Sequence, residues 1–329
     1  MKAFIIGGTG LVGYHTANEL LKRGHEVQSV GLTPLTKDNK FAKRTNYSQA
    51  NIEELTNHEI VEMLKGTDWL LYACSTNSVE IVKAPAEEYY RVHNIMQTER
   101  IFRLARDAGV KKIILLSDAY EYFNVNMDNL RLEKHHPYIK ATFEQENVAR
   151  KYNTVAYPVI ILQVAQIWGY MPRRKPLHYE SVMEMYRTNN FSTFKGSTPV
   201  ITAQQVAEAV CGAFEKIDRG QTIAISGDNM KYKTINENLM LGLNMKPYVP
   251  YFCKCRYKWH ERRRIRVLKK SGLEAGINPV KIYDFRQKDA FIDPQIAFKT
   301  LGVQPQDIQK EIQETAKVIL EFARQHKQI

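Results

Sequence analysis

The residues best suited to chemistry in this sequence stand at its start, where glycines cluster directly after an apolar run. Residues 2–6 are largely apolar, and the segment Gly7-Gly8-Thr9-Gly10-Leu11-Val12-Gly13 follows them. Glycines let the chain turn tightly and bring backbone N–H groups close to an anion, and a helix that begins here favours a pyrophosphate at its N-terminus. We therefore expect a dinucleotide site, although a glycine-rich turn without a ligand would have the same composition.

A second group of chemically capable side chains is the basic segment 254–266, which reads KCRYKWHERRRIR. Its arginines could clamp a diphosphate, cover a solvated helix face, or contact a nucleic acid or an anionic membrane. All three readings stay open at this point. Cys253, Cys255 and His260 lack the second ligand pair of a usual zinc site, so we expect no metal.

Length and composition bound the remaining possibilities. The 329 residues can hold one large or two smaller cores, and the net charge of +12 favours anionic ligands such as nucleotides. We do not expect nucleic acid to be the main partner. No apolar run is long enough to insert into a membrane, no secretory leader is expected, and the cysteines form no disulfide pattern. A cytoplasmic protein is the simplest expectation.

The elements that position these groups alternate between strand and helix in the first half of the chain. We predict strands at 26–30, 69–74, 112–117 and 159–162, and the mainly apolar runs in the last three are typical of buried parallel strands. The segments 14–23, 51–65, 86–108 and 138–152 predict the helices that connect them. This alternation predicts an α/β fold of the Rossmann type, with a doubly wound parallel sheet.

The pattern changes after Gly169. We predict a dinucleotide-binding Rossmann domain over residues 1–168. Residues 169–329 should form mainly a smaller C-terminal substrate lobe, with some segments returning to the main sheet. The predicted elements of this half are helices at 179–188, 203–216 and 305–326 and a strand at 222–226.

With these elements placed, the chain resembles the extended short-chain dehydrogenases/reductases, the NAD(P)-dependent epimerase/dehydratase family, over nearly its whole length. The glycine segment matches the family's GGTGxxG start, and the strand that ends at Ala73 and Cys74 resembles the one whose end lies against the cofactor. Asn94 falls in a segment similar to the family's Asn-x-x-Gly-Thr helix, and residues 291–305 resemble its last D…A…LG…P segment.

The resemblance implies an NAD(P)-dependent oxidoreductase or epimerase/dehydratase that acts on an anionic or sugar-like small molecule. The substrate would be a nucleotide-sugar or another hydroxyl/carbonyl compound, and a homodimer is compatible with the family. In such enzymes a tyrosine exchanges a proton with the substrate and a serine polarises the reacting oxygen. The resemblance places the tyrosine at Tyr138. Asp118 stands at the position of the family's second serine, usually the catalytic one, so that either Ser117 compensates or Asp118 acts as a base.

The catalytic motif is atypical. Thr142 stands where the family has a lysine four residues after the tyrosine, and Lys140 falls on the opposite side of the helix. A shifted pair of His136 with Lys140 would restore the spacing. These departures leave a second interpretation open, a catalytically degenerate dinucleotide-binding protein with a sensory or scaffolding role.

The cofactor preference depends on the end of the second strand. An NAD-preferring site usually carries an acidic residue there, and this chain has Gly31, followed by Thr33 and Lys37. The missing carboxylate removes a repulsion against a 2′-phosphate, which favours NADP over NAD. Asn51 is expected beside the adenine.

Overall fold

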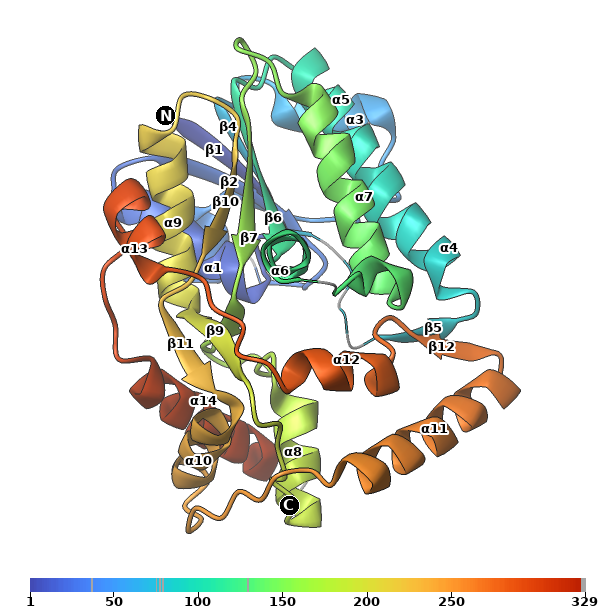
Figure 1. Cartoon of the computed structure of the whole chain (residues 1–329). Coiled ribbons are helices and arrows are strands. Elements are labelled where there is room, and N and C mark those ends of the chain that lie inside the picture. The colour runs from blue at the N-terminus through green and yellow to red at the C-terminus, as the bar shows by residue number, and fades with distance from the viewer. Residues whose placement is uncertain (37, 75, 77, 79, 129, 327–329) are drawn as a thin grey trace.

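The computed structural model describes residues 1–36, 38–74, 76, 78, 80–128 and 130–326. Its centre is a seven-stranded sheet with the strand order β10-β7-β6-β4-β1-β2-β3, visible edge-on in Figure 1. Each neighbouring pair in this sheet is parallel. The predicted doubly wound α/β fold is therefore confirmed.

Helices cover both faces of the large sheet. Its strands are β1 (Lys2–Ile6), β2 (Glu26–Gly31), β3 (Tyr47–Gln49), β4 (Trp69–Tyr72), β6 (Lys112–Asp118), β7 (Val159–Val164) and β10 (Thr222–Ile225). One apolar core lies between the sheet and helices α1 (Leu11–Lys22) and α9 (Ala203–Lys216). The second core lies under α3 (Asn57–Leu64), α5 (Gln97–Asp107) and α7 (Pro137–Tyr152). Strands buried on both faces explain the continuous apolar runs of the sequence.

The strand order creates a crevice at one edge of the sheet. All carboxyl ends lie at the same edge because the strands are parallel. β2 and β4 flank β1, so the connections wind away from β1 in opposite directions. Ligands of open α/β sheets bind at such a switch point, and the residues that follow β1, β2, β4 and β6 are therefore the natural site residues.

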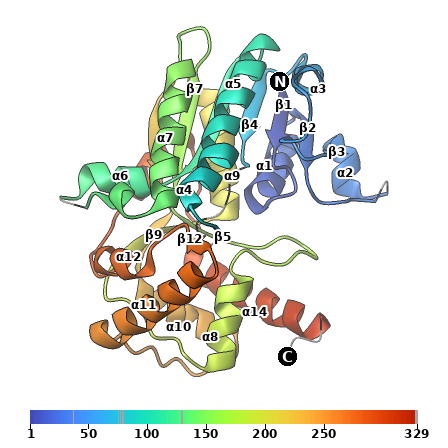
Figure 2. The ribbon, with the colours of Figure 1, turned by 90° about the vertical axis from the view of Figure 1, so that its right-hand side faces the viewer.

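A smaller lobe lies below this edge in Figure 2. It contains a three-stranded sheet of β8 (Gln166–Trp168), β9 (Ser197–Thr202) and β11 (Asp228–Lys231), packed with α8 (Tyr179–Thr188), α10 (Tyr232–Gly242) and α14 (Ile308–Gln325). A separate antiparallel pair joins β5 (Ile81–Lys83) to β12 (Leu273–Ala275) beside α11 (Lys254–Lys270) and α12 (Pro279–Arg286). β10 and α9 lie beyond residue 168 in sequence but belong to the large sheet and its cover.

The helix predicted over residues 86–108 is divided into three parts. α4 (Ala86–Tyr90) continues into a π-helical turn, Arg91–Met96, and then into α5. Asn94 lies in this turn with its side chain buried, and its Oδ1 accepts hydrogen bonds from the Thr76 backbone N–H at 3.1 Å and the Thr76 hydroxyl at 2.7 Å. Such wider turns are frequent at functional sites, and this one binds Thr76, which follows β4 in the chain.

Helix starts differ in a way that bears on function. α9 begins at a capping box, in which the Thr202 hydroxyl accepts from the Gln205 N–H at 3.0 Å and the Gln205 side chain accepts from the Thr202 N–H at 3.1 Å. α1 begins after Gly10, which has no side chain to cap it.

In the described part of the chain, none of the helices has the length and apolarity that a membrane crossing requires.

Candidate active site

The glycine segment forms a compact loop between β1 and α1. Gly7 adopts a φ of +94°, and the N–H groups of Gly7 and Gly8 donate to the Val30 oxygen at 2.9 and 3.0 Å. A Cβ atom on Gly13 would lie 2.2 Å from the Gly7 oxygen. These positions therefore need glycine for the turn and for the close approach of α1 to β1.

The first turn of α1 is open to an anion. In the described part of the chain, the backbone N–H groups of Leu11, Val12 and Gly13 have no hydrogen-bond acceptor. The positive end of the helix dipole adds to their attraction for negative charge. This uncapped helix start fits the pyrophosphate of a dinucleotide, with Thr9 beside it.

The end of β2 is closed by two hydroxyl side chains. A Cβ atom on Gly31 would lie 2.5 Å from Thr9 Oγ1, and the Tyr47 hydroxyl lies 2.7 Å from the carbonyl oxygens of both Gly31 and Thr33. The carboxylate of an NAD-type site is absent here, as the sequence showed. Lys37 lies outside the described residues.

An arginine from a distant loop reaches this end of the site. The loop leaves β8 and passes α1, where the Tyr170 carbonyl oxygen lies 3.1 Å from His15 Nε2. Burial raises the pKa of the Tyr47 hydroxyl. Arg174 lies close enough to Tyr47 for its positive charge to lower the same pKa in part. Arg174 forms no ion pair with the residues that the structure describes. Sequence reasoning missed it because the two segments are far apart in the chain.

The remaining predicted cofactor residues occupy the neighbourhood of β4. A Cβ atom on Gly7 would lie 2.6 Å from the Ala73 oxygen, so the end of β4 touches the glycine loop. Cys74 follows it, and burial raises the pKa of its thiol. Asn94 uses its side-chain oxygen to hold the loop after β4, as described above, which makes it a supporting residue.

Asn51 forms a local turn. Its Oδ1 accepts from the Glu53 N–H at 3.2 Å, and its Nδ2 donates to Glu54 Oε1 at 2.8 Å. This geometry is that of an Asx turn, which any Asn can form without a ligand.

The catalytic candidates on β6 face opposite sides because side chains alternate along a strand. The Ser117 hydroxyl donates to Glu146 Oε1 at 2.5 Å, and Glu146 is a buried residue of α7. Burial and the neighbouring Glu121 raise the pKa of Glu146 to about 9. Ser117 is thus engaged in a buried network that includes Arg150, at 2.7 Å from Glu146 Oε2.

Asp118 lies at the carboxyl end of β6, at the opening of the crevice. It keeps part of its surface accessible, yet the surrounding protein desolvates the carboxylate enough to raise its pKa to about 7, even though the N–H groups of Tyr120 and Ala119 lower it. A carboxyl group that titrates near neutrality can both take and give a proton. This property marks Asp118 as the acid/base candidate.

Tyr138 stands in the first turn of α7, within electrostatic range of Asp118. Burial and then the Asp118 charge raise the pKa of its hydroxyl well above the usual value, and Thr142 only partly offsets them. Thr142 also donates its hydroxyl to the Tyr138 carbonyl oxygen at 3.0 Å. With threonine at the lysine position and its pKa raised, the Tyr138 hydroxyl stays protonated at neutral pH and is therefore able to donate a hydrogen bond.

The alternative pair of His136 and Lys140 is not brought together. The Lys140 side chain is 44% exposed and binds Glu87 at 3.2 Å. His136 is buried, its Nδ1 accepts from the Asn278 N–H at 3.0 Å, and burial lowers its pKa to about 4.

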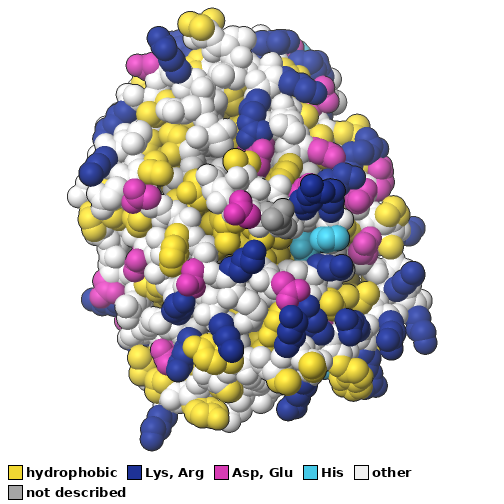
Figure 3. Space-filling view, viewed as in Figure 1, with side chains coloured by type: hydrophobic (Ala, Val, Ile, Leu, Met, Phe, Trp, Pro, Cys, Tyr) yellow, Lys and Arg dark blue, Asp and Glu magenta, His cyan; other side chains and the backbone are white. Residues whose placement is uncertain are grey.

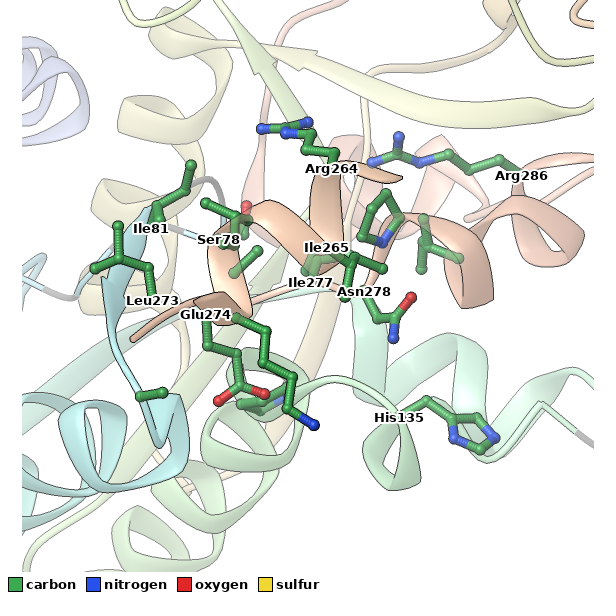
Figure 4. Close-up of a pocket in the computed structure, with 17 residues that line it drawn as sticks. Ser78, Ile81, His135, Arg264, Ile265, Leu273, Glu274, Ile277, Asn278 and Arg286 are labelled. Atoms are coloured by element: carbon green, nitrogen blue, oxygen red, sulfur yellow. The ribbon is translucent and has the colours of Figure 1, made fainter. Parts of the chain in front are cut away.

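A cavity of about 460 Å³ lies next to α7, between the β5–β12 pair, α11 and α12. Most of its lining is apolar, and Arg264 and Arg286 enter it at the same end, as Figure 4 shows. The wall of the cavity is joined to the site because the Tyr138 N–H donates to the Gly276 oxygen at 3.0 Å. Arg286 also interacts with the hydroxyl of Tyr120, two residues after Asp118.

Arg286 and Tyr120 were not singled out from the sequence. Tyr120 lies two residues after the predicted site residue Asp118, which was a signal, whereas Arg286 lies on a helix far along the chain with no motif around it. Among the described residues no group of His, Cys, Asp and Glu is arranged to hold a metal ion, and the four cysteines are free.

Comparison with known proteins shows the family and the fold of this chain. The model of the NAD dependent epimerase/dehydratase family matches residues 3–225. A curated relative, the 4-hydroxy-2-methyl-3-oxo-4-farnesyl-3,4-dihydroquinoline-1-oxide ketoreductase of Stigmatella aurantiaca, is 22% identical over 236 residues, which are 67% of this chain and 65% of the relative. The chain thus spans slightly less than two thirds of that relative's length.

Solved structures share the fold over nearly the full length. A UDP-glucose-4-epimerase from Stenotrophomonas maltophila, with bound NAD and formylated UDP-arabinopyranose, superposes with a TM-score of 0.71 at 16% identity and covers 100% of this chain and 99% of its own. A UDP-glucuronic acid 4-epimerase from Bacillus cereus, in complex with UDP-glucuronic acid and NAD, gives 0.70 at 15% identity, with 98% and 99% covered. At these identities the likeness concerns the fold.

Proposed function

This chain belongs to the NAD dependent epimerase/dehydratase family, and on that premise we propose that it is an NAD(P)-dependent oxidoreductase or epimerase/dehydratase with an Asp118–Tyr138 acid/base pair. The observation that carries the proposal is the Asp118 carboxyl group, whose pKa of about 7 coincides with an intact dinucleotide loop on the same sheet edge. Among the residues that the structure describes, no cation pairs with Asp118, and desolvating an unpaired carboxylate costs free energy, which favours a chemical role at this position.

The residues divide the work as follows. Gly7 to Gly13 and the open start of α1 hold the pyrophosphate, and the bound nicotinamide would supply hydride transfer. Tyr138 donates a hydrogen bond to the reacting oxygen of the substrate. Asp118 takes the proton when a hydroxyl is oxidised and returns it when a carbonyl is reduced.

The proposed substrate is a hydroxyl/carbonyl compound with an anionic group, for which a nucleotide-sugar is the first candidate. Arg264 and Arg286 at one end of the cavity suit a phosphate or carboxylate. The apolar lining of the cavity also suits a larger apolar part, which makes non-sugar carbonyl compounds a reasonable second class to assay.

NADP is the proposed preference within this class. Arg174 supplies, from across the crevice, the positive charge that the end of β2 lacks, and no carboxylate stands at Gly31 to repel a 2′-phosphate. We place the protein in the cytoplasm, where free cysteines are stable and nicotinamide cofactors are available.

The decisive experiment combines binding with turnover. Isothermal titration with NADP and NAD tests the loop, and assays of nucleotide-sugars and carbonyl compounds follow cofactor oxidation or product isomers. Tyr138→Phe and Asp118→Asn should each keep cofactor binding and lose most of the turnover. Turnover that survives both substitutions contradicts the assigned acid/base pair.

A second candidate is a dinucleotide-binding protein without catalysis. It is favoured by the Tyr138 hydroxyl, whose pKa is raised with no lysine to lower it. Full cofactor binding with no turnover across the whole substrate panel would select this candidate, whereas activity that depends on Tyr138 would eliminate it.

A further inference from the structure

One face of helix α11, called here the inner face, packs against the rest of the protein. The Tyr257 ring packs on the Tyr283 ring with their centroids 5.0 Å apart, and Glu261 is buried. Ile265 and Leu268, spaced by three and four residues from their neighbours on this face, line the cavity beside α12. These contacts hold the inner face of α11 against the rest of the protein.

The outer face carries a different set of side chains. Arg256, Trp259, Arg263, Arg266 and Lys270 follow one another at spacings of three or four residues, so they share one side of the helix. The Trp259 side chain is 63% exposed, and Val267, on the adjoining row, is 57% exposed. Figure 1 shows α11 along the lower right border of the molecule, and Figure 3 shows basic side chains gathered there with apolar ones between them.

The charge of this outer face is not neutralised within the protein. α11 holds nine Lys or Arg and a single Glu in its 17 residues. Lys254 and Lys258 pair with Asp284, and Arg264 pairs with Glu261. The arginines of the outer face form no ion pair with any residue that the structure describes. A solvated helix face ordinarily mixes both signs, and this one does not.

We propose that the outer face of α11 docks the protein on an anionic phospholipid membrane, with Trp259 entering the headgroup region. Clusters of Lys and Arg on a helix are complementary to the negative surface of such a membrane. Tryptophan favours the interface between water and lipid, and the segment before α11 exposes two further aromatic rings, Tyr248 at 77% and Tyr251 at 48%.

Two other occupants fit the face less well. A symmetric second copy of the chain would bring the cationic stripe against itself, and like charges at contact repel. A nucleic acid satisfies the arginines, but it offers no apolar layer for Val267 beside Trp259. The membrane accommodates both the charge and the apolar side chains.

Vesicle sedimentation of the full chain tests the docking. The protein should pellet with vesicles of phosphatidylcholine mixed with phosphatidylglycerol and stay in solution with phosphatidylcholine alone. Each cation near an anionic surface contributes about fivefold in partitioning, so Arg256→Gln, Arg263→Gln and Arg266→Gln together should weaken binding roughly a hundredfold. The matched control with the same charge change, Lys22→Gln, Lys65→Gln and Lys317→Gln, should bind like the parent chain.

Tryptophan emission separates lipid from nucleic acid. The chain has three tryptophans, and Trp69 and Trp168 are buried, so Trp259 reports on the surface. Anionic vesicles should shift its emission to shorter wavelength and protect it from acrylamide, and Trp259→Phe should abolish both effects without unfolding the protein. The proposal is overturned if anionic vesicles do not bind, if both triple variants bind equally, or if a single-stranded oligonucleotide binds tighter than the vesicles and quenches Trp259.

Discussion

At neutral pH the two polar groups that face the crevice hold their protons differently. Asp118 titrates near neutrality because desolvation offsets its backbone hydrogen bonds, while Tyr138 keeps its proton because burial and the Asp118 charge both oppose ionisation. In the proposed mechanism the pair divides the work, since Tyr138 positions the reacting oxygen and Asp118 exchanges the proton. The missing lysine is consistent with such a division.

A pH profile tests this assignment. Oxidation requires ionised Asp118, so kcat/KM for oxidation should rise as pH increases through about 7, and the reverse reduction should fall over the same range. Asp118→Asn should lower kcat by about a hundredfold or more and remove this limb of the profile. A limb that persists in the variant would assign the titration to another group.

Arg174 gives a second prediction at the residue scale. If it binds a 2′-phosphate, Arg174→Gln should weaken NADPH binding roughly tenfold to a hundredfold, the loss expected for a hydrogen bond between charged groups, and leave NADH binding unchanged. Arg173, the neighbouring exposed residue, provides the matched control as Arg173→Gln. Equal losses for both cofactors would show that Arg174 acts on the loop instead.

At the scale of elements, the hydrogen bonds of the Glu146 side chain connect α7 to β6. Glu146 accepts from Ser117 on β6 and from Gln163 on β7, at 2.5 and 2.8 Å, and pairs with Arg150 one turn further along α7. The start of α7, and with it Tyr138, is held at a fixed distance from the end of β6. The Ser117 hydroxyl therefore contributes to the site through the position of these elements.

The protonation of Glu146 makes the stability of this unit depend on pH. Its pKa is about 9 in the folded chain against 4.5 for the free side chain, so folding binds a proton between these values and stability falls as pH rises through them. The pKa of Glu121 is lowered, so its effect is confined to more acidic solution. Glu146→Gln, which cannot ionise, should flatten the decline of the urea midpoint between pH 5 and 9, and an unchanged slope would contradict the assignment.

The sequence was most informative where an element has one strong local signal. The apolar runs and the glycine loop predicted the central strands and α1, because buried parallel strands and tight turns leave clear patterns. Short strands such as β5 and β12 were not predicted, since their pairing depends on segments far apart in the chain. Arg174 and Arg286 were not predicted as site residues for the same reason, because they reach the site from elements that are distant in the sequence.

At the scale of the whole molecule, the glycine loop and the second lobe meet at one crevice, so ligand binding should stabilise the entire fold. A cofactor at a hundred times its dissociation constant adds about 2.7 kcal/mol to the free energy of unfolding. Thermal denaturation should therefore shift upward by a few degrees with the preferred cofactor. The triple arginine variant of α11 should show the same shift, which would separate the cofactor site from the outer face of this helix.

The pairing of β5 with β12 has a consequence for the order in which the protein is made. Ile81 pairs with Ala275 and Lys83 with Leu273, so one strand leaves the ribosome long before its partner is translated. The last strand of the large sheet, β10, ends at Ile225, well before β12 begins. A nascent chain can therefore form all seven strands of the large sheet while the cavity still lacks the wall that β12 and α12 provide. The proposed cofactor loop is thus made early in synthesis, and the proposed substrate cavity is complete only when synthesis is nearly finished.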